Sequence, residues 1–426
     1  MSHHSSLQTR RTSEHAAATV DVSTPVTLTA GAAGRKFRLD AGTARINPRH
    51  AAAALAPSPL HEAPARDNAN ETLEAFVFRY GQYFDSYLAT EPGRWNFWSR
   101  NRRGLISYVQ RGRYVLAGGG LFAPDDHREG LLGEFVEATA RRKLHVAFYN
   151  IGDEALPLFR KFDFQVTKWG EEPIVDLGNC TWGGKSFEWV RRQTNYCLRH
   201  GVTAFEVHPD NLEPQQWSRT LNEIYEVSAE SLEHKPQAAP MKFFEGQIEN
   251  HELGLRRLFV ARSTYGAGRL EGFLICNPIR NGLSWSTELY RRRTDSVRGT
   301  MAFLIHHALQ QFQTEGVSHV GLCLDPGLRC SDPLPGDSPF VRHLVKFNDR
   351  HASFLFDIAG LRHFKTRFRP RYENRYICSR PKASLGSTLA FMNVSGLLNL
   401  SLPKLAHVCL DRVRKHAARK SLAGVD

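Results

Sequence analysis

Glu288 and Arg291 are the two residues whose types and spacing most directly suggest chemistry. They lie three apart in TELYR (287–291), where an alternating apolar segment gives way to the charged run RRRTDS. A carboxylate at such a place binds an ammonium group or takes a proton from a hydroxyl. An arginine there holds a phosphate through two hydrogen bonds or polarises an ester. The alternative is that both are solvated side chains at a strand end.

The segment LRHFKTRFRPRYENRY (361–376) threads cations between aromatic residues. Its apolar spacing predicts a helix that ends before Pro370, with Phe364 and Phe368 in the core. The cations are Arg362, Lys365, Arg367 and Arg369. Because so many like charges within two turns repel one another, and because three of them fall off the apolar stripe, we predict an anion-binding face.

Two other segments offer groups for binding a ligand. A helix predicted over 186–201 carries Arg191 and Asn195 on one face, with Lys185 just before it, and an arginine near a helix N-terminus suits a phosphate. In GGGLF (118–122), Gly118 and Gly119 permit close approach of the backbone to a ligand. A solvated helix face and a tight turn are the respective alternatives.

Alternating strand and helix patterns must position these residues, and they occur as two sets. The first set comprises a helix at 72–89, strands at 104–110 and 113–122, a helix at 129–142, a strand at 144–150 and a helix at 153–162. The second comprises a helix at 186–201, a strand at 203–208, a helix at 211–233, strands at 255–262, 270–278 and 282–290, a helix at 299–316 and a strand at 317–324. A strand at 373–379 follows. Periodicity alone supports two α/β layers.

The bulk composition favours a polyanionic partner. The 426 residues carry a formal charge of +13, which suits nucleic acid, an anionic membrane or a phosphorylated substrate. Seven scattered cysteines without a C-x-x-C motif predict neither a disulfide framework nor a zinc site. The N-terminus has no apolar signal core, and no run of about eighteen apolar residues predicts a transmembrane helix.

Five segments in order resemble the C-terminal, cytosolic domain of bacterial lysylphosphatidylglycerol synthases (the phosphatidylglycerol lysyltransferase family). They are KWGEEPIVDL (168–177), GGKSFEWVRRQTNYCLRHG (183–201), STELYRRR (286–293), RGTMAFLIHHAL (298–309) and FLFDIAGLRHFKTRFRPRYENRY (354–376). The resemblance covers about residues 72–380. It implies an α/β (α+β) fold of two tandem N-acetyltransferase-like domains with mixed central sheets.

The resemblance divides the chain into a disordered segment (1–70), two domains (71–180 and 181–382) and a basic amphipathic tail (383–426). Within the tail, 389–403 is uncharged and 410–420 is basic, so it either lies at a membrane surface or packs on the second domain. Full-length family members carry a membrane region upstream, and this chain is expected to be a free-standing form.

The family's activity implies the reaction and several site residues. It moves an aminoacyl group from aminoacyl-tRNA to a lipid hydroxyl, and ester exchange needs no ATP, metal or other cofactor. Arg291, Arg191 and Asn195 match family positions, Lys365 and Arg367 match a basic pair near the substrate, and Glu171 and Glu172 match a Gly-Glu-Glu turn. Glu288 replaces the usual Asp, and the acid and proline usual near Gly119 are missing, which leaves the aminoacyl group open.

We therefore expect a cytoplasmic aminoacyltransferase, peripheral to the inner face of the membrane, with aminoacyl-tRNA, a membrane lipid and the anionic membrane surface as partners. The anion held by the basic helix would be a tRNA phosphate or a lipid head group. One rival is an acyl-CoA-dependent N- or O-acyltransferase of the same fold, although RTDSVRGT (293–300) only distantly imitates a pyrophosphate loop. Another is a non-catalytic RNA- or membrane-binding module.

Overall fold

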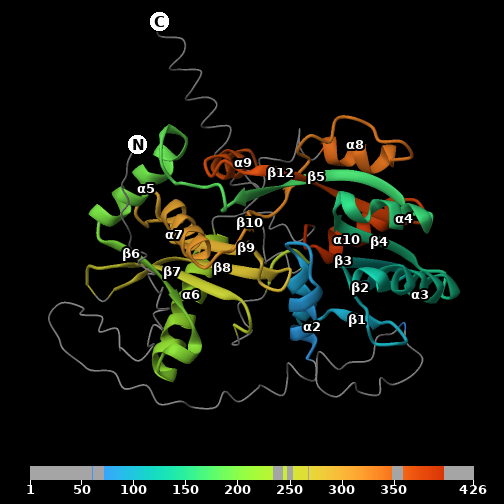
Figure 1. Ribbon diagram of the computed structural model, residues 1–426, viewed down its shortest axis with the longest axis horizontal. Helices are drawn as coiled ribbons and strands as arrows, with labels where there is room; N and C mark the ends of the chain where they lie inside the picture. The colour runs from blue at the N-terminus through green and yellow to red at the C-terminus, as the bar shows by residue number, and fades with distance from the viewer. Residues whose placement is uncertain are drawn as a thin grey trace, which may run out of the picture. The chain divides into compact units, whose positions relative to one another are not determined.

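The computed structural model describes residue 60 and residues 72–233, 243–246, 253–266, 268–347 and 358–397. The segment expected to be disordered, apart from residue 60, and the basic cluster at 410–420 lie outside these residues. The described part of the chain forms a single mixed sheet of twelve strands with helices on both faces (Figure 1). The predicted α/β class with mixed sheets is confirmed.

The strands are β1 (Trp95–Trp98), β2 (Leu105–Arg111), β3 (Tyr114–Phe122), β4 (His145–Ile151), β5 (Gln165–Asp176), β6 (Val202–Val207), β7 (Arg257–Ser263), β8 (Leu270–Ile279), β9 (Ser284–Arg292), β10 (His319–Gly321), β11 (Asp325–Pro326) and β12 (Arg371–Arg380). Their order across the sheet is β1-β2-β3-β4-β12-β5-β10-β9-β8-β7-β6, and β11 pairs with β5.

The helices are α2 (Leu73–Tyr80), α3 (Arg128–Arg141), α4 (Leu156–Lys161), α5 (Glu188–Arg199), α6 (Pro214–Glu233), α7 (Thr300–Thr314), α8 (Pro339–Phe347), α9 (Ile358–Thr366) and α10 (Leu385–Val394). Two 3-10 turns matter for the site, η1 (Ser86–Thr90) and η4 (Lys185–Phe187). Helix α9 ends before Pro370 as predicted.

The two halves of the sheet repeat one pattern, as expected of tandem acetyltransferase-like units. Antiparallel strands β1–β3 are followed by β4, which runs parallel to β3, and antiparallel strands β6–β9 are followed by β10, which runs parallel to β9. Each parallel pair separates before its longer strand ends. The β3–β4 pairing stops at Ala117, and the β9–β10 pairing stops at Ser286.

Each half of the sheet is completed by a strand that comes from the other half of the chain. Strand β12 pairs antiparallel with β4 of the first half, whereas β5 pairs antiparallel with β10 of the second half. Strands β5 and β12 also pair with each other along most of their length. The domain boundary near residue 180 therefore stays a prediction, because four strand pairings cross it.

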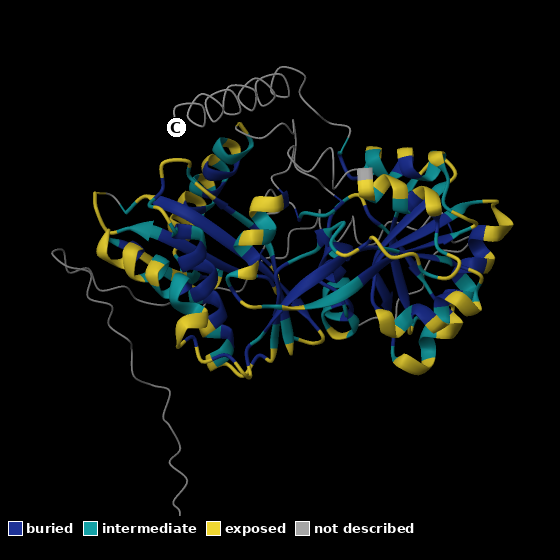
Figure 2. Ribbon diagram, turned by 90° about the horizontal axis from the view of Figure 1, so that it is seen from above, coloured by how far each residue is buried: buried dark blue, intermediate teal, exposed yellow. Residues whose placement is uncertain are grey.

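Separate apolar clusters hold the helices to the two faces of the sheet, and most positions of the strands are buried (Figure 2). In the first half, α3 packs through Leu132 and Phe135. In the second half, α7 packs on one face through Leu309 and Phe312, and α6 covers the opposite face (Figure 1). Phe368, two residues beyond the end of α9, is fully buried against the α7 face, which confirms it as a core residue, and Phe364 of α9 is partly buried beside it.

Several local predictions were wrong. The expected helix at 72–89 ends at Gly81, whose backbone is extended, and η1 follows. The strand expected at 317–324 is only three residues long because Cys323 adopts a positive φ of 60°. Strands β1 and β5 and helix α8 were not predicted.

Glu171 and Glu172 lie inside β5 and not in a turn, which corrects the prediction for GEEP. Glu172 is buried and accepts hydrogen bonds from Arg375. Glu171 pairs with Lys168 at 2.6 Å and Arg329 at 3.1 Å. The strand continues because β12 and β11 pair with this stretch and the buried charges find partners across the sheet.

The beginning of the predicted tail is part of the fold. Phe391 of α10 stacks on Tyr149 of the first half with ring centroids 4.5 Å apart, and Val394 packs against the same cluster. The packing alternative therefore holds for 385–394: Phe391 contacts Tyr149 and Trp169 of the first half as well as Phe243 and Phe244, which follow α6. No helix within the described residues is long and apolar enough to cross a bilayer.

Candidate active site

Glu288 lies in β9 two residues beyond the point where β10 leaves it. A bulge in the β8–β9 pairing places Glu288 opposite no residue of β8. Its Oε1 atom accepts a hydrogen bond from the amide of Gly246, whereas Oε2 is buried and has no partner among the described residues. Such an atom lacks the compensation that buried polar groups normally have, so it is available to a ligand.

The surroundings of Glu288 favour the protonated form of its carboxyl group. Burial raises the pKa of this carboxyl group from 4.5 to about 7; Arg256 opposes the shift and Glu91 adds to it. Glu91 and Arg256 form a buried ion pair of 3.2 Å. A methyl group at Gly246 would lie 2.8 Å from Oε1 of Glu91, so a glycine is needed where this segment passes over both carboxylates. A pKa near neutrality suits a group that exchanges a proton with its ligand.

Arg94 links this carboxylate to the first half of the sheet. Its guanidinium is buried, donates to the carbonyl of Phe243 at 2.7 Å, and interacts electrostatically with Asp85, Glu91 and Glu288. Burial lowers the pKa of Arg94, and the three carboxylates oppose that shift. The candidate active site therefore draws charged groups from both halves.

Asp85 occupies the corresponding opening in the first half, where β4 leaves β3. Its Oδ2 atom accepts from the amide of Gly119 at 3.1 Å and from Nδ2 of Asn150 at 2.7 Å. Burial raises the pKa of Asp85 against these hydrogen bonds. Its Oδ1 atom and Oδ1 of Asn150 are buried without a partner among the described residues. A carboxylate from another segment therefore lies beside the glycines, where the sequence showed none.

Each of the glycines at 118–120 has close neighbours at the place where a side chain would project. A Cβ atom at Gly118 would lie 3.2 Å from Arg94 and 3.3 Å from Asp85. Gly119 has a φ of +79°, in the region that favours glycine. Both residues are strand positions and not part of a tight turn.

Arg291 is fully engaged by the protein. Its guanidinium donates to Ser228 Oγ of α6 at 2.7 Å and to Glu245 at 2.9 Å, and only 3% of the side chain is exposed. Glu245 precedes Gly246, whose amide binds Glu288. Arg291 therefore holds the segment that orients Glu288, and its prediction as a phosphate- or ester-binding group finds no support in this geometry.

Lys365 does not lie on a solvent-facing cationic surface, which corrects the geometry predicted for the basic helix. Its ammonium is buried and donates to Asp325 at 2.8 Å and to the carbonyls of Cys323 and Leu324 at 3.0 and 3.2 Å. The carboxylate and the two carbonyls take the place of the external anion that was predicted from the crowding of positive charges.

The neighbouring cations of α9 are also engaged. Arg362 donates to the carbonyl of Pro326, and Arg369 to the carbonyl of Ser186 at 3.1 Å. Arg367 contacts His363 at 2.7 Å and lies over the ring of Trp189. Of the four, Arg369 is exposed, Arg362 and Arg367 are half-exposed, and only Lys365 is buried.

The residues predicted at α5 lie on the α7 face and not beside Glu288. Arg191 donates to the carbonyls of Trp182 and Gly184 at 2.8 and 2.7 Å, so it closes the preceding loop. Lys185 lies in η4, and Asn195 is exposed on α5. The structure thus brings Gly118, Gly119, Glu288 and Arg291 to one region and leaves these three outside it.

Sequence reasoning missed most of the polar groups of the site, namely the buried residues Asp85, Glu91, Arg94, Asn150 and Arg256 and the partly exposed Glu245. The signal was weak. Glu91 and Arg94 precede the aromatic segment WNFW (95–98), where charges beside a buried strand are unusual. The other four carry no local pattern.

The geometry can accept a polar, positively charged group and exchange a proton with it. Unpartnered acceptors on Glu288, Asp85 and Asn150 face buried surroundings, and arginines balance most of the negative charge. Asn277, which pairs with Ser286 beside the β9–β10 opening, is fully buried with both amide atoms unpartnered among the described residues. Within the same residues, no group of three or more His, Cys, Asp or Glu side chains is placed to hold a metal ion.

Comparison with known proteins confirms the resemblance. The family model described as "Phosphatidylglycerol lysyltransferase, C-terminal" matches residues 74–379. The phosphatidylglycerol lysyltransferase of Bacillus subtilis is 24% identical over 75% of this chain and 36% of its own length. The Staphylococcus epidermidis protein of that name (strain ATCC 12228) is 24% identical over 74% of this chain and 36% of its own length. This chain thus spans about a third of the length of these relatives.

Solved structures share the fold. The structure of L-PGS from Bacillus licheniformis aligns with a TM-score of 0.63 and 25% identity, over 76% of this chain and 96% of that one. The C-terminal domain of a putative lysylphosphatidylglycerol synthetase from Agrobacterium fabrum aligns with a TM-score of 0.63 and 22% identity, over 76% and 95% respectively.

Proposed function

The chain belongs to the family of the phosphatidylglycerol lysyltransferase C-terminal domain, and from this premise we propose that it transfers an aminoacyl group from aminoacyl-tRNA to the hydroxyl group of a lipid. The relatives' names support a lipid acceptor such as phosphatidylglycerol. The charge of +13 suits a polyanionic donor and an anionic membrane surface.

The observation that carries the proposal is the carboxyl group of Glu288. It is held near its titration point, with a pKa of about 7, and its Oε2 atom has no partner among the described residues. Ester exchange requires one proton to leave the attacking hydroxyl and one to reach the departing ribose oxygen. A base whose pKa lies near the working pH serves both transfers.

In the proposed reaction the lipid hydroxyl oxygen attacks the carbonyl carbon of the aminoacyl ester. Glu288 Oε2 takes the hydroxyl proton as the new C–O bond forms. The tetrahedral intermediate then expels the ribose oxygen, and Glu288 returns the proton to it. One ester replaces another, so no oxidant, nucleotide or other co-reactant is consumed.

The remaining buried groups position the reactants. Asp85, through its unpartnered Oδ1, is suited to bind the ammonium of the aminoacyl group. Arg94, between Asp85 and Glu288, stabilises negative charge as it develops on the carbonyl oxygen. Arg291 acts through Glu245 and Gly246 by keeping Glu288 in place. Lys365, Arg362, Arg367 and Arg369 stay predictions as substrate-binding residues.

The test is a transfer assay with the full chain, tRNA charged with a labelled amino acid, and vesicles of phosphatidylglycerol. We expect alkali-labile label in the lipid extract, loss of this product when ribonuclease is added first, and loss of it in Glu288→Gln. A parallel mixture replaces the charged tRNA with acyl-CoA.

Label that stays on the RNA with every aminoacyl-tRNA supplied would contradict the proposal. Transfer from acyl-CoA alone would favour the acyltransferase alternative. Lipid extraction from cells with and without the gene, with a search for a ninhydrin-positive lipid, identifies the acceptor and the amino acid.

A further inference from the structure

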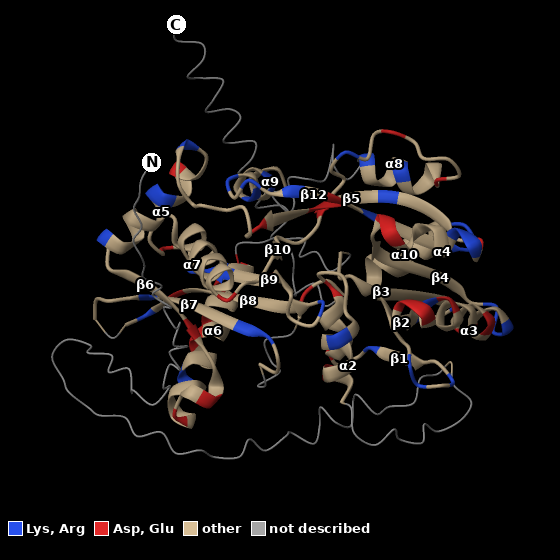
Figure 3. Cartoon of the chain, in the orientation of Figure 1, with Lys and Arg blue, Asp and Glu red and all other residues tan. Residues whose placement is uncertain are grey.

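A basic pocket lies on the α7 face of the second half, outside the candidate active site. Its volume is about 560 Å³, within the range of pockets that hold small ligands. The lining residues are Arg192, Gln193, Asn195, Tyr196, Leu198, Arg199 and Arg298. All but Arg298 come from α5, and Figure 3 shows Lys and Arg along this helix in blue.

The arginines that α5 contributes to the pocket are exposed and lie on one face of the helix. Arg192, Asn195 or Tyr196, and Arg199 follow one another at three- and four-residue spacing, which places them on one face of α5. Arg192 pairs with Glu188 and Arg199 donates to the carbonyl of Asn195 at 3.2 Å. Neither contact removes the guanidinium from solvent, so both arginines keep donors for an anion.

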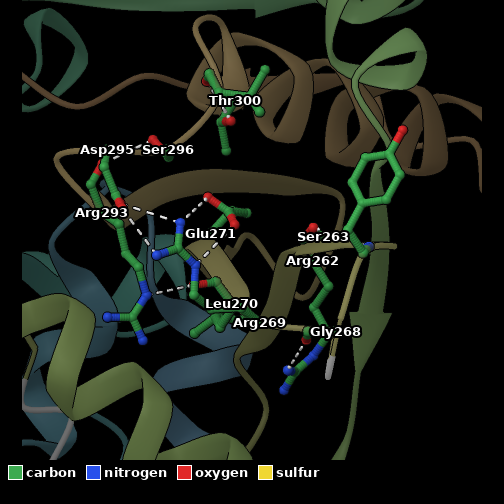
Figure 4. Close-up of polar contacts among 12 residues, drawn as sticks. Arg262, Ser263, Gly268, Arg269, Leu270, Glu271, Arg293, Asp295, Ser296 and Thr300 are labelled. Atoms are coloured by element: carbon green, nitrogen blue, oxygen red, sulfur yellow. Dashed lines mark hydrogen bonds and ion pairs between the residues drawn. The ribbon is translucent and has the colours of Figure 1, made fainter.

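Arg298 is held opposite α5 by an anchored loop. Both terminal nitrogens of Arg269 donate hydrogen bonds to the carboxylate of Asp295, at 3.0 and 3.2 Å. Arg293 donates to the carbonyl of Leu270 at 2.8 Å (Figure 4). These contacts tie residues 293–296 to the start of β8. The backbone that leads to Arg298 is therefore held to the sheet, and the carbonyl of Arg298 accepts a hydrogen bond from Cys197 of α5 at 3.6 Å.

The pocket also borders the first turn of α7. Gly299 is the N-cap, with a φ of +91°, and no side chain caps this helix end. A Cβ at Gly299 would lie 2.7 Å from Oε1 of Gln193, so the helix end lies directly against the pocket wall. The positive end of the helix dipole adds to the three arginines.

An aromatic surface lies beside these charges. The ring of Tyr196 is 37% exposed and stacks on His200, with centroids 3.9 Å apart. Leu198 is 51% exposed. Cations next to an exposed, stacked aromatic ring match the needs of single-stranded nucleic acid, whose phosphates pair with arginine while its bases stack on aromatic side chains.

We propose that this pocket binds a nucleotide of a single-stranded RNA end, with its phosphates on Arg192, Arg199 and Arg298 and its base on Tyr196. The inference deepens the proposed function, on which it rests, because it assigns a place on the protein to the RNA of the donor. A lipid phosphate would use the same arginines but not the aromatic ring.

The experiment measures binding of a short, uncharged single-stranded RNA ending in CCA to the full chain across a salt series. In the variant Arg192→Gln, Arg199→Gln, Arg298→Gln, the slope of log affinity against log salt should fall by about 2, at roughly 0.7 per lost contact. The control variant Arg103→Gln, Arg111→Gln, Arg113→Gln removes three exposed cations of the first half and should leave the slope nearly unchanged.

Tyr196→Ala separates a nucleotide from a simple anion. It should weaken binding of the RNA by roughly five- to a hundredfold and leave binding of inorganic polyphosphate unchanged. Equal slopes for the pocket and control variants would overturn the proposal. So would a Tyr196→Ala variant that binds RNA like the parent, or a pocket variant impaired only toward phosphatidylglycerol vesicles.

The outcomes separate this inference from the proposed function. The binding assay contains no aminoacyl group and no lipid, so it tests the pocket alone. If the RNA binds at the pocket and the separate transfer assay gives no product, only the proposed function is contradicted. Transfer at the parental rate by the pocket variant, at RNA concentrations below saturation, would contradict only the pocket.

Discussion

Glu288→Gln should make the protein more stable at high pH while it abolishes transfer. Burial raises the pKa of Glu288 in the folded chain from 4.5 to about 7. Between these values the unfolded chain has lost the proton and the folded chain still holds it, so the free energy of unfolding falls as pH rises. At about 1.4 kcal/mol per pH unit the loss amounts to roughly 3 kcal/mol, complete above pH 7. Glutamine carries no charge at any pH, so the Glu288→Gln variant does not show this loss of stability.

The assay is urea unfolding of the parent and the variant between pH 4.5 and pH 8.5, followed by tryptophan fluorescence. The difference in the free energy of unfolding should be small near pH 4.5 and should grow to roughly 3 kcal/mol in favour of Glu288→Gln above pH 7. Glu230→Gln is the matched control. Hydrogen bonds from Thr294 lower the pKa of Glu230 below its usual 4.5, so the stability that this carboxylate contributes is already present over most of the pH range. Glu230→Gln should therefore be less stable than the parent by an amount that hardly changes above about pH 5.5. A difference between Glu288→Gln and the parent that does not change with pH would refute the reasoning.

Three further predictions follow from the same structure. Lys365→Met leaves Asp325 buried without its ion pair, so the free energy of unfolding should fall by about 3–5 kcal/mol in urea titration; a change within 1 kcal/mol would show that water reaches the pair. Arg291→Ala removes the hydrogen bonds to Ser228 and Glu245 and should lower both the melting temperature and the transfer rate, whereas an unchanged melting temperature would contradict its positioning role. A chain ended after residue 382 loses the stacking of Phe391 on Tyr149 and should melt earlier, whereas one ended after residue 397 should melt like the parent and lose only binding to anionic vesicles, by roughly 1 kcal/mol per cation removed; equal melting of the two would show that α10 does not stabilise the fold.

Local patterns in the sequence predicted most of the elements because apolar spacing reflects which face each element buries. They failed where contacts between residues far apart in the sequence determine the local structure. Cys323 breaks a strand through its positive φ, and GEEP extends as a strand only because β12 and β11 pair with it. Similarly, the four cations of 362–369 carry the same charge in the sequence, yet Lys365 is buried against Asp325, forty residues away in the chain.

The sequence by itself determined the two α/β sets, the family, and the positions of Glu288 and Arg291, because periodicity and short motifs are local properties. Only the tertiary structure decided what these two residues do. The raised pKa of Glu288 and the engagement of Arg291 depend on desolvation and on charges from segments far apart in the chain, such as Glu91, Arg256 and Glu245. The exchange of β5 and β12 brings the two halves into one sheet, and Arg94, from just before β1 of the first half, interacts with Glu288 of the second. Electrostatic energy depends on distance in space and on burial, and the spacing of residues along the chain determines neither.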